Sequence, residues 1–120
     1  MNVLRDLQNR AAARPAHIVL SEGHDPRVVA GALDALNAGM GPITLVGPTA
    51  QIKERLADAG ATGREGLHIQ DPENSTLTAT YAALYYDLRK HKGVSEEVAA
   101  QQARDPMVFA ALMVCNGDAD

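Results

Sequence analysis

HIVLSEGHDPRVV, residues 17–29, contains the pattern that decides the fold. The apolar, β-branched run at residues 17–20 is typical of a short buried strand. Asp25 and Pro26 then predict a helix start, because aspartate caps helix N-termini and proline suits the first helical position. A buried strand followed at once by a helix is the unit from which parallel sheets are built.

Helices and strands alternate on both sides of this stretch. Apolar spacing predicts a helix before it, over residues 3–11 and ended by Pro15, and places Val29, Leu33 and Leu36 on the inner face of the helix that follows. Further strands are expected at residues 43–47 and 67–70. Between them, a helix should begin at Pro48-Thr49 and turn Ile52, Leu56 and Ala59 inward.

The second half of the chain has a different pattern. Residues 75–92 can form one helix, Ser95 caps a second, and Asp105-Pro106 opens a third. We therefore predict one α/β domain over residues 1–120. Its architecture is three-layer α/β/α with a mainly parallel, Rossmann-like sheet and a following helical segment. The end at NGDAD, where an alternating chain should begin a strand, predicts an incomplete first domain of a longer protein.

Composition excludes several classes of function. Fifteen Asp and Glu against 11 Lys and Arg give a net charge of −4, which argues against a nucleic-acid or membrane partner. The single Cys115 rules out an intrachain disulfide, fits a reducing compartment and lies in an apolar run that predicts burial. With no signal peptide and no membrane span in view, we expect a cytoplasmic protein.

Metal and nucleotide motifs are missing from the sequence. The four histidines have no metal-ligand spacing, and His17 and His68 lie in expected strands, where a structural role is favoured. Neither a Walker motif nor G-x-G-x-x-G is present, so a dinucleotide site is unsupported. We predict no metal and no cofactor.

Two candidate anion sites stand out. Gly23 lies in the loop after the first strand, where α/β sheets bind ligands and a glycine leaves room for close approach. Acidic residues in the same loop, Glu22 and Asp25, favour a structural role instead. The second candidate is YYDLRKHKG, residues 85–93, which gathers basic side chains at a helix end.

The helix dipole explains part of that basic cluster. Lys90 should point into water, and Lys92 should close the helix before Gly93. Arg89 flanks the apolar stripe of Tyr81, Leu84, Tyr85 and Leu88, so it should lie at the rim of the buried face. There it can bind phosphate or carboxylate through charge-assisted hydrogen bonds, or pair with Asp87 or another acidic residue.

Several motifs together resemble the phosphate acetyltransferase family. They are IVLSEGHDPRVV with ITLVGP, YYDLRKHKGVSEEVA, DPMVFAALMV and GDAD, and they follow in the family's order from about His17 to Asp120. The Arg-Lys-His-Lys-Gly block is the most specific of them. Related phosphate butyryltransferases and the acetyltransferase-like part of some malic enzymes share the fold but usually lack that block. Ser21 stands where the family usually has proline.

The resemblance implies a reaction, acetyl-CoA plus phosphate exchanging with acetyl phosphate plus coenzyme A (CoA). It also implies a two-domain α/β enzyme, commonly a homodimer, with its site between the domains and no metal in the chemistry. Arg89 matches the arginine associated with binding CoA or substrate phosphate; Lys92 and Gly23 are weaker candidates. Family catalytic residues lie further along longer chains, so we expect no catalytic residue here and no activity from this chain alone.

Two other classes of function remain as alternatives. A free-standing module that binds CoA or phosphate without catalysis would show measurable CoA affinity. A structural or interaction domain would fold normally and bind neither ligand.

Overall fold

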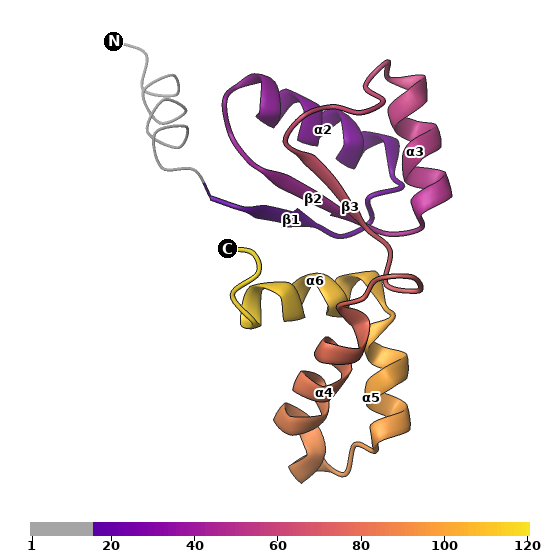
Figure 1. Ribbon diagram of the computed structural model, residues 1–120, viewed down its shortest axis with the longest axis vertical. Helices are drawn as coiled ribbons and strands as arrows, with labels where there is room; N and C mark the ends of the chain where they lie inside the picture. Colours follow the sequence, from indigo (N-terminus) through magenta and orange to yellow (C-terminus); the bar gives the residue numbers. More distant parts are fainter. Residues whose placement is uncertain (1–15) are drawn as a thin grey trace.

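The computed structural model describes residues 16–120, which form three strands and five α-helices (Figure 1). In chain order these are β1 (Ile18–Leu20), α2 (Pro26–Asn37), β2 (Ile43–Val46), α3 (Thr49–Asp58), β3 (Leu67–Gln70), α4 (Thr78–Arg89), α5 (Glu96–Ala103) and α6 (Pro106–Cys115), with a 3-10 turn, Lys90–Lys92, after α4. The helix expected over residues 3–11 lies outside the described residues. None of the described helices has the length and apolar character needed to cross a membrane.

The three strands form one parallel sheet in the order β1-β2-β3. Ile18 pairs with Ile43, and Ile43 pairs with Leu67, so the strands lie in matched register. All four residues of the central strand β2 are buried because both of its faces and both of its edges are covered. This arrangement confirms the predicted parallel α/β class.

Helices α2 and α3 cover one face of the sheet (Figure 1). The sequence signals for α2 act as expected: the side chain of Asp25 accepts a hydrogen bond from the Arg27 amide, and Pro26 is the first helical residue. Apolar side chains from both helices meet the sheet in one core cluster, whose buried members are Val29, Ala32, Ile43, Leu45, Ile52 and Leu56. Burial of apolar area in this layer is the main force that holds the two helices to the sheet.

Helix α6 covers the opposite face and joins the sheet to the helical half. Phe109 of α6 and Tyr81 of α4 are fully buried, and their rings pack edge to face with centroids 4.8 Å apart. Both belong to the core cluster that includes Val46 of β2. Helices α4 and α5 pack together and extend away from the sheet below α6 (Figure 1).

Four details of the sequence prediction are wrong. Helix α4 begins at Thr78 instead of Ser75, because the Ser75 side chain bonds the Leu77 amide and Gln70 and holds the turn before the helix. Ala59 is exposed because α3 ends at Asp58. Leu88 is 50% exposed and Cys115 is also exposed, because each lies in the last turn of a helix beyond the packed core.

The C-terminal residues return to the start of the sheet. The amide of Asp120 donates to the carbonyl of His17 over 2.8 Å, and the amide of His17 donates to the Asp120 carboxylate over 2.8 Å. Nearby, the Tyr81 hydroxyl donates to Asp118, and burial together with this carboxylate raises the pKa of the Tyr81 hydroxyl. His17, which precedes β1, also bonds Thr44 through Nε2 over 2.6 Å, as its predicted structural role requires.

Candidate functional site

The loop after β1 packs against the sheet through Gly23. The Gly23 amide donates to the carbonyl of Val46 over 3.0 Å. A Cβ at this position would lie 2.8 Å from Cβ of Leu45 and 3.1 Å from Cδ1 of Ile52. Gly23 is therefore needed where the loop meets β2 and α3, and the space that its missing side chain leaves is already filled by protein.

Asp25 in the same loop is neutralised within the chain. Its carboxylate accepts from the Arg27 amide over 2.8 Å and forms an ion pair with the Arg27 guanidinium at 3.0 Å. These side-chain and backbone hydrogen bonds lower the pKa of Asp25 to about 2. The Asp25 carboxylate thus caps the N-terminus of α2, and the positive end of the helix dipole stabilises the carboxylate charge.

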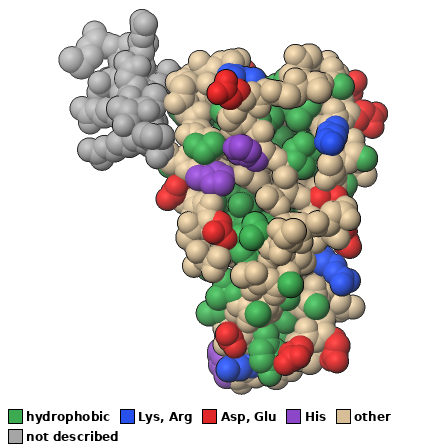
Figure 2. Space-filling model, viewed as in Figure 1, with side chains coloured by type: hydrophobic (Ala, Val, Ile, Leu, Met, Phe, Trp, Pro, Cys, Tyr) green, Lys and Arg blue, Asp and Glu red, His purple; other side chains and the backbone are tan. Residues whose placement is uncertain are grey.

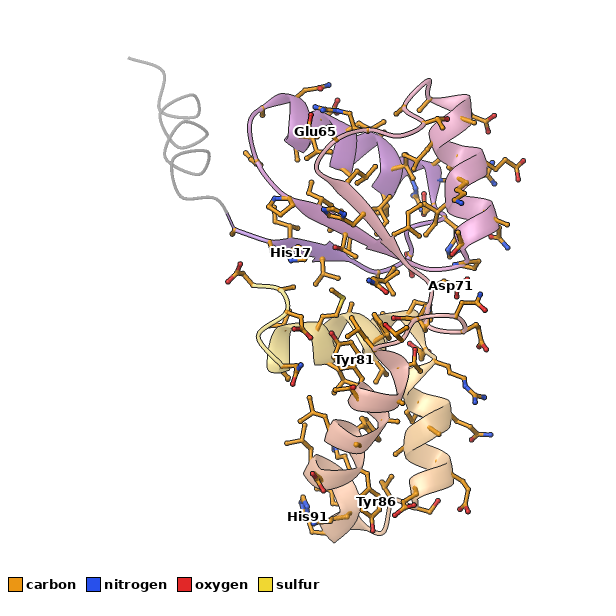
Figure 3. The ribbon with its side chains drawn as sticks, in the orientation of Figure 1. His17, Glu65, Asp71, Tyr81, Tyr86 and His91 are labelled. Atoms are coloured by element: carbon orange, nitrogen blue, oxygen red, sulfur yellow. The ribbon has the colours of Figure 1, made fainter. Side chains whose placement is uncertain are left out.

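Asp71, at the carboxyl end of β3, connects two loops (Figure 3). One carboxylate oxygen accepts from the amide and the hydroxyl of Thr49 at the start of α3, and the other accepts from the amide of Glu73. Desolvation raises the pKa of Asp71, but the hydrogen bonds from Thr49, Glu73 and Asn74 outweigh it and hold that pKa below its usual value. Because Pro48 gives α3 no side-chain cap, Asp71 caps this helix from 22 residues away in the sequence.

The polar groups described above, at the carboxyl edge of the sheet, therefore form hydrogen bonds with other residues of the same chain. The Arg55 side chain donates to the carbonyl of His24 and ties α3 to the loop after β1. The buried Nδ1 of His24 lacks a hydrogen-bond partner within residues 16–120. These contacts favour a structural role for this loop, and Gly23 as a ligand contact stays a prediction.

Arg89 is the last residue of α4. The helix begins at Thr78 and is about 18 Å long. Asp87 pairs with Lys90, at 3.6 Å, and not with Arg89. In the described part of the chain the Arg89 guanidinium has no carboxylate partner, and the residue is exposed, beyond the rim position that we expected. The structure leaves this positive charge available to an external anion.

Lys92 and Gly93 complete the end of this helix. Residues Lys90–Lys92 form a 3-10 turn, and Gly93 adopts a left-handed φ of 82° while its amide donates to the carbonyl of Lys90. A left-handed residue at this position favours glycine. Lys92 is exposed, so it can contribute to the local positive potential without a fixed contact.

An apolar groove adjoins Arg89 between α4 and α6. Its volume is about 330 Å³, and it is lined by Tyr85, Leu88, Arg89, Met107, Val108, Ala111, Leu112 and Cys115. Met107 is 65% exposed and Leu88 50%, so the groove presents large apolar side chains to solvent. Hydrophobic side chains also reach the surface on the visible face of the helical half (Figure 2). We call this feature the Arg89 groove.

Arg89 and Gly23 do not share a site. Gly23 lies at the carboxyl edge of the sheet, whereas the end of α4, marked by His91 in Figure 3, lies far from Asp71 on that edge. Sequence reasoning missed the α6 side of the groove, including Met107 and Cys115. A signal was present, because residues 106–115 lack a polar face and such a helix needs contacts on more than one side.

Comparison with known families gives a match over nearly the whole chain. The family model described as phosphate acetyl/butaryl transferase matches residues 2–120. Among curated proteins, the chain is 32% identical to a phosphate acetyltransferase of Clostridium acetobutylicum over 120 residues, covering all of this chain and 36% of that protein. It is 34% identical to a phosphate acetyltransferase of Escherichia coli over 117 residues, covering 98% of this chain and 16% of that protein.

Solved structures share the same fold. A phosphotransacetylase from Streptococcus pyogenes superposes with a TM-score of 0.89 at 24% identity, and the EutD phosphotransacetylase from Staphylococcus aureus with a TM-score of 0.86 at 23% identity. Each superposition covers 100% of this chain and 37% of the other. The chain thus spans about a third of the length of several relatives and less of others.

Proposed function

Because the chain belongs to the phosphate acetyl/butaryl transferase family, we propose that it is part of an enzyme that transfers an acetyl group between CoA and phosphate. The family match over residues 2–120 is the observation that carries this proposal. Relatives named phosphate acetyltransferase support acetyl as the transferred group. The direction proposed is acetyl-CoA plus phosphate giving acetyl phosphate plus CoA, together with its reverse.

We place the anion contact at Arg89. Its guanidinium has no carboxylate partner among the described residues, and a guanidinium can bind phosphate oxygens through two parallel hydrogen bonds. CoA carries phosphates at one end and a flexible thiol arm at the other. The apolar side chains of the Arg89 groove, among them Leu88 and Met107, offer a surface for the less polar part of such a ligand.

The chemistry needs more than this groove contains. In the reverse reaction the CoA thiol loses its proton, its sulfur attacks the carbonyl carbon of acetyl phosphate, and the bond to the phosphate oxygen breaks. A carboxylate or imidazole would have to take that proton. The described residues that line the Arg89 groove include neither group.

This observation favours a second candidate for the 120-residue chain by itself, a module that binds CoA or phosphate without turning it over. For the whole enzyme we propose CoA as a substrate, with no further cofactor and no metal. We further propose a cytoplasmic homodimer that contacts neither nucleic acid nor membrane.

Calorimetric titration of CoA into the 120-residue chain tests the binding step. We expect Arg89→Ala to weaken CoA binding about tenfold or more, as the loss of a charge-assisted contact predicts. Arg89→Lys should also bind more weakly, because a single ammonium cannot replace the two-pronged contact. Lys92→Ala is the matched control, since it removes a nearby exposed cation; equal losses in Arg89→Ala and Lys92→Ala would contradict a specific role for Arg89.

An activity assay separates the two candidates. Formation of acetyl-CoA from acetyl phosphate and CoA should be absent for the 120-residue chain. In a longer chain with turnover, Arg89→Ala should raise the KM for CoA or acetyl phosphate while the fold stays intact. Turnover by the short chain would exclude the binding-module candidate, and an unchanged KM and kcat in the longer variant would remove Arg89 from the site.

A further inference from the structure

A second cavity lies on the other side of the molecule, at the open edge of the sheet. It has a volume of about 470 Å³ and is lined by residues of α3, of the segment that follows it, and of β3; Figure 1 shows where these elements lie. Its lining residues are Lys53, Leu56, Thr62, Gly63, Arg64, Leu67, His68 and Ile69. We call it the β3-edge cavity, because among the strands that the structure describes β3 pairs only with β2.

The charged side chains of this cavity are not neutralised within residues 16–120. The Arg64 guanidinium donates to two neutral acceptors, the carbonyl of Glu65 and the side-chain oxygen of Asn37, each over 3.3 Å. Neither Lys53 nor Arg64 has an ion pair among the described residues, and no lining residue is acidic. The lining therefore carries Lys53 and Arg64 and no carboxylate, in a chain whose net charge is −4.

The floor of the β3-edge cavity is apolar. Leu56 is only 6% exposed, and Leu67 and Ile69 pack against the same core cluster. At the mouth, Gly63 adopts a left-handed φ of 73°, and a Cβ there would meet nothing within 4 Å. A ligand that fits must therefore bring an anionic group to Lys53 and Arg64 and an apolar body to the floor.

Two occupants suit this chemistry, a small organic anion or an acidic peptide that adds a strand to β3. Volume favours the small molecule, because 470 Å³ lies within the range of small-ligand sites. Geometry also disfavours a strand, since β3 has only four residues and the Leu67 amide already donates to the carbonyl of Arg64 over 3.3 Å. The cavity is better formed for a compact ligand than for an extended one.

We propose that the β3-edge cavity binds a small organic phosphate, with Lys53 and Arg64 on the phosphate and Leu56, Leu67 and Ile69 under its apolar part. This site is separate from the Arg89 groove, on α3 and β3 instead of α4 and α6. It is independent of the acetyl transfer proposed above, and either proposal can fail without the other.

Phenyl phosphate is a suitable probe because it combines a phosphate with a compact ring. We expect its titration into the 120-residue chain to shift the backbone amide NMR signals of Gly63 and Ile69 in a saturable way. Inorganic phosphate and phenol each carry one half of the probe. Each should bind at least about tenfold more weakly than phenyl phosphate, because each loses one set of contacts.

Charge reversal locates the site. Lys53→Glu, at an exposed helix position, should weaken phenyl phosphate binding about tenfold while leaving the free energy of unfolding nearly unchanged. Lys90→Glu is the matched control, because Lys90 is an exposed cation that pairs with Asp87 and lines neither cavity; it should leave the affinity measured at Gly63 and Ile69 unchanged. Arg64→Lys keeps the charge but loses the two guanidinium hydrogen bonds, one to Asn37 and one to the Glu65 carbonyl, so an intermediate affinity is expected.

Several results would overturn the proposal. They are shifts confined to α4 and α6, an affinity that Lys53→Glu leaves unchanged, or no saturable shift at Gly63 and Ile69. Binding of an acidic peptide along β3 in the absence of phenyl phosphate binding would assign the cavity to the other occupant.

Discussion

The α/β half and the helical half of this chain use their charged side chains in opposite ways. At the carboxyl edge of the sheet, Asp25 and Asp71 bind the chain's own amides and cap α2 and α3. At the end of α4, Arg89 has no partner among the described residues and adjoins an apolar groove. At the edge where α/β sheets usually bind ligands, these two carboxylates are therefore already hydrogen-bonded within the chain.

This difference shows that the position of a loop in a fold does not establish a ligand site. A loop that satisfies its own hydrogen bonds gains little from a ligand, whereas an unpaired guanidinium beside exposed apolar groups gains both charge neutralisation and burial. Substitutions at four positions test how far the contrast holds.

Phe109→Ala should have the largest effect, because Phe109 is the fully buried contact between α6 and Tyr81 of α4. We expect the free energy of unfolding to fall by about 3–5 kcal/mol, as for other buried aromatic truncations. Urea denaturation measures this change. Met107→Ala, on the exposed side of the same helix, is the control; a loss below about 1 kcal/mol for Phe109→Ala would mean that the two halves are not joined through this contact.

Gly23→Ala should destabilise the α/β half by about 1–3 kcal/mol, the usual range for overpacking. The added Cβ would lie 2.8 Å from Leu45, which belongs to the buried core. Gly31→Ala provides the matched control, because Gly31 lies in α2 with nothing within 4 Å of its added Cβ. That control should stabilise the chain by about 0.5–1 kcal/mol through helix propensity.

Gly23→Ala also tests the ligand prediction for this loop. CoA affinity of the folded fraction should be unchanged if Gly23 is structural. If Gly23→Ala instead kept the stability of the unchanged chain but bound CoA more weakly, this loop would be a ligand site.

Asp71→Ala should cost about 1–2 kcal/mol, the range for losing a helix cap. The folded pKa of Asp71 lies below its ordinary value of 3.8, so its charged form stabilises the fold. That contribution is complete well above pH 3.8 and is lost as the pH falls through the folded pKa. Asp25, whose folded pKa is about 2, contributes in the same direction.

Urea denaturation as a function of pH isolates the Asp71 contribution. Asp71→Asn should lose less stability than the unchanged chain as the pH falls below about 4, because Asn does not titrate. Glu73→Gln, in the same loop and exposed, should keep the original pH dependence. Identical acid profiles for Asp71→Asn and the unchanged chain would refute this account of Asp71.

Met107→Gln should have the smallest effect on stability, within about 0.5 kcal/mol, because its side chain is largely in water. CoA affinity should nevertheless fall in calorimetric titration if the Arg89 groove binds the ligand. Gln51→Ala, at an exposed position of α3, is a control expected to leave both quantities unchanged. Unaltered CoA binding by Met107→Gln would limit the ligand contact to Arg89 itself.

Local signals predicted most of the fold. Residues 67–70 form the expected strand, and Asp25-Pro26, Ser95 and Asp105-Pro106 begin helices as expected. These predictions succeed because caps and apolar periodicity act within a few residues of each other. The predicted burial of Leu88 and Cys115 was wrong, because burial at a helix end depends on whether another element covers it.

The candidate site was predictable only in part. The YYDLRKHKG motif singled out Arg89 as an anion contact, whereas the groove beside it required α6 to pack against α4. Likewise, no local pattern linked Lys53 to Arg64, which the turn after α3 brings to one cavity.

By itself, the sequence determined the parallel α/β class, the helix starts other than that of α4, and the family, because each depends on residues close together in the chain or on their order. Tertiary structure alone decided that Asp71 caps α3, that Gly23 is held against Leu45, and that Arg89 is left without a carboxylate partner in the described chain. The physical reason is that these outcomes depend on contacts between residues far apart in sequence, and only the packed sheet and helices bring such residues within hydrogen-bond or van der Waals distance.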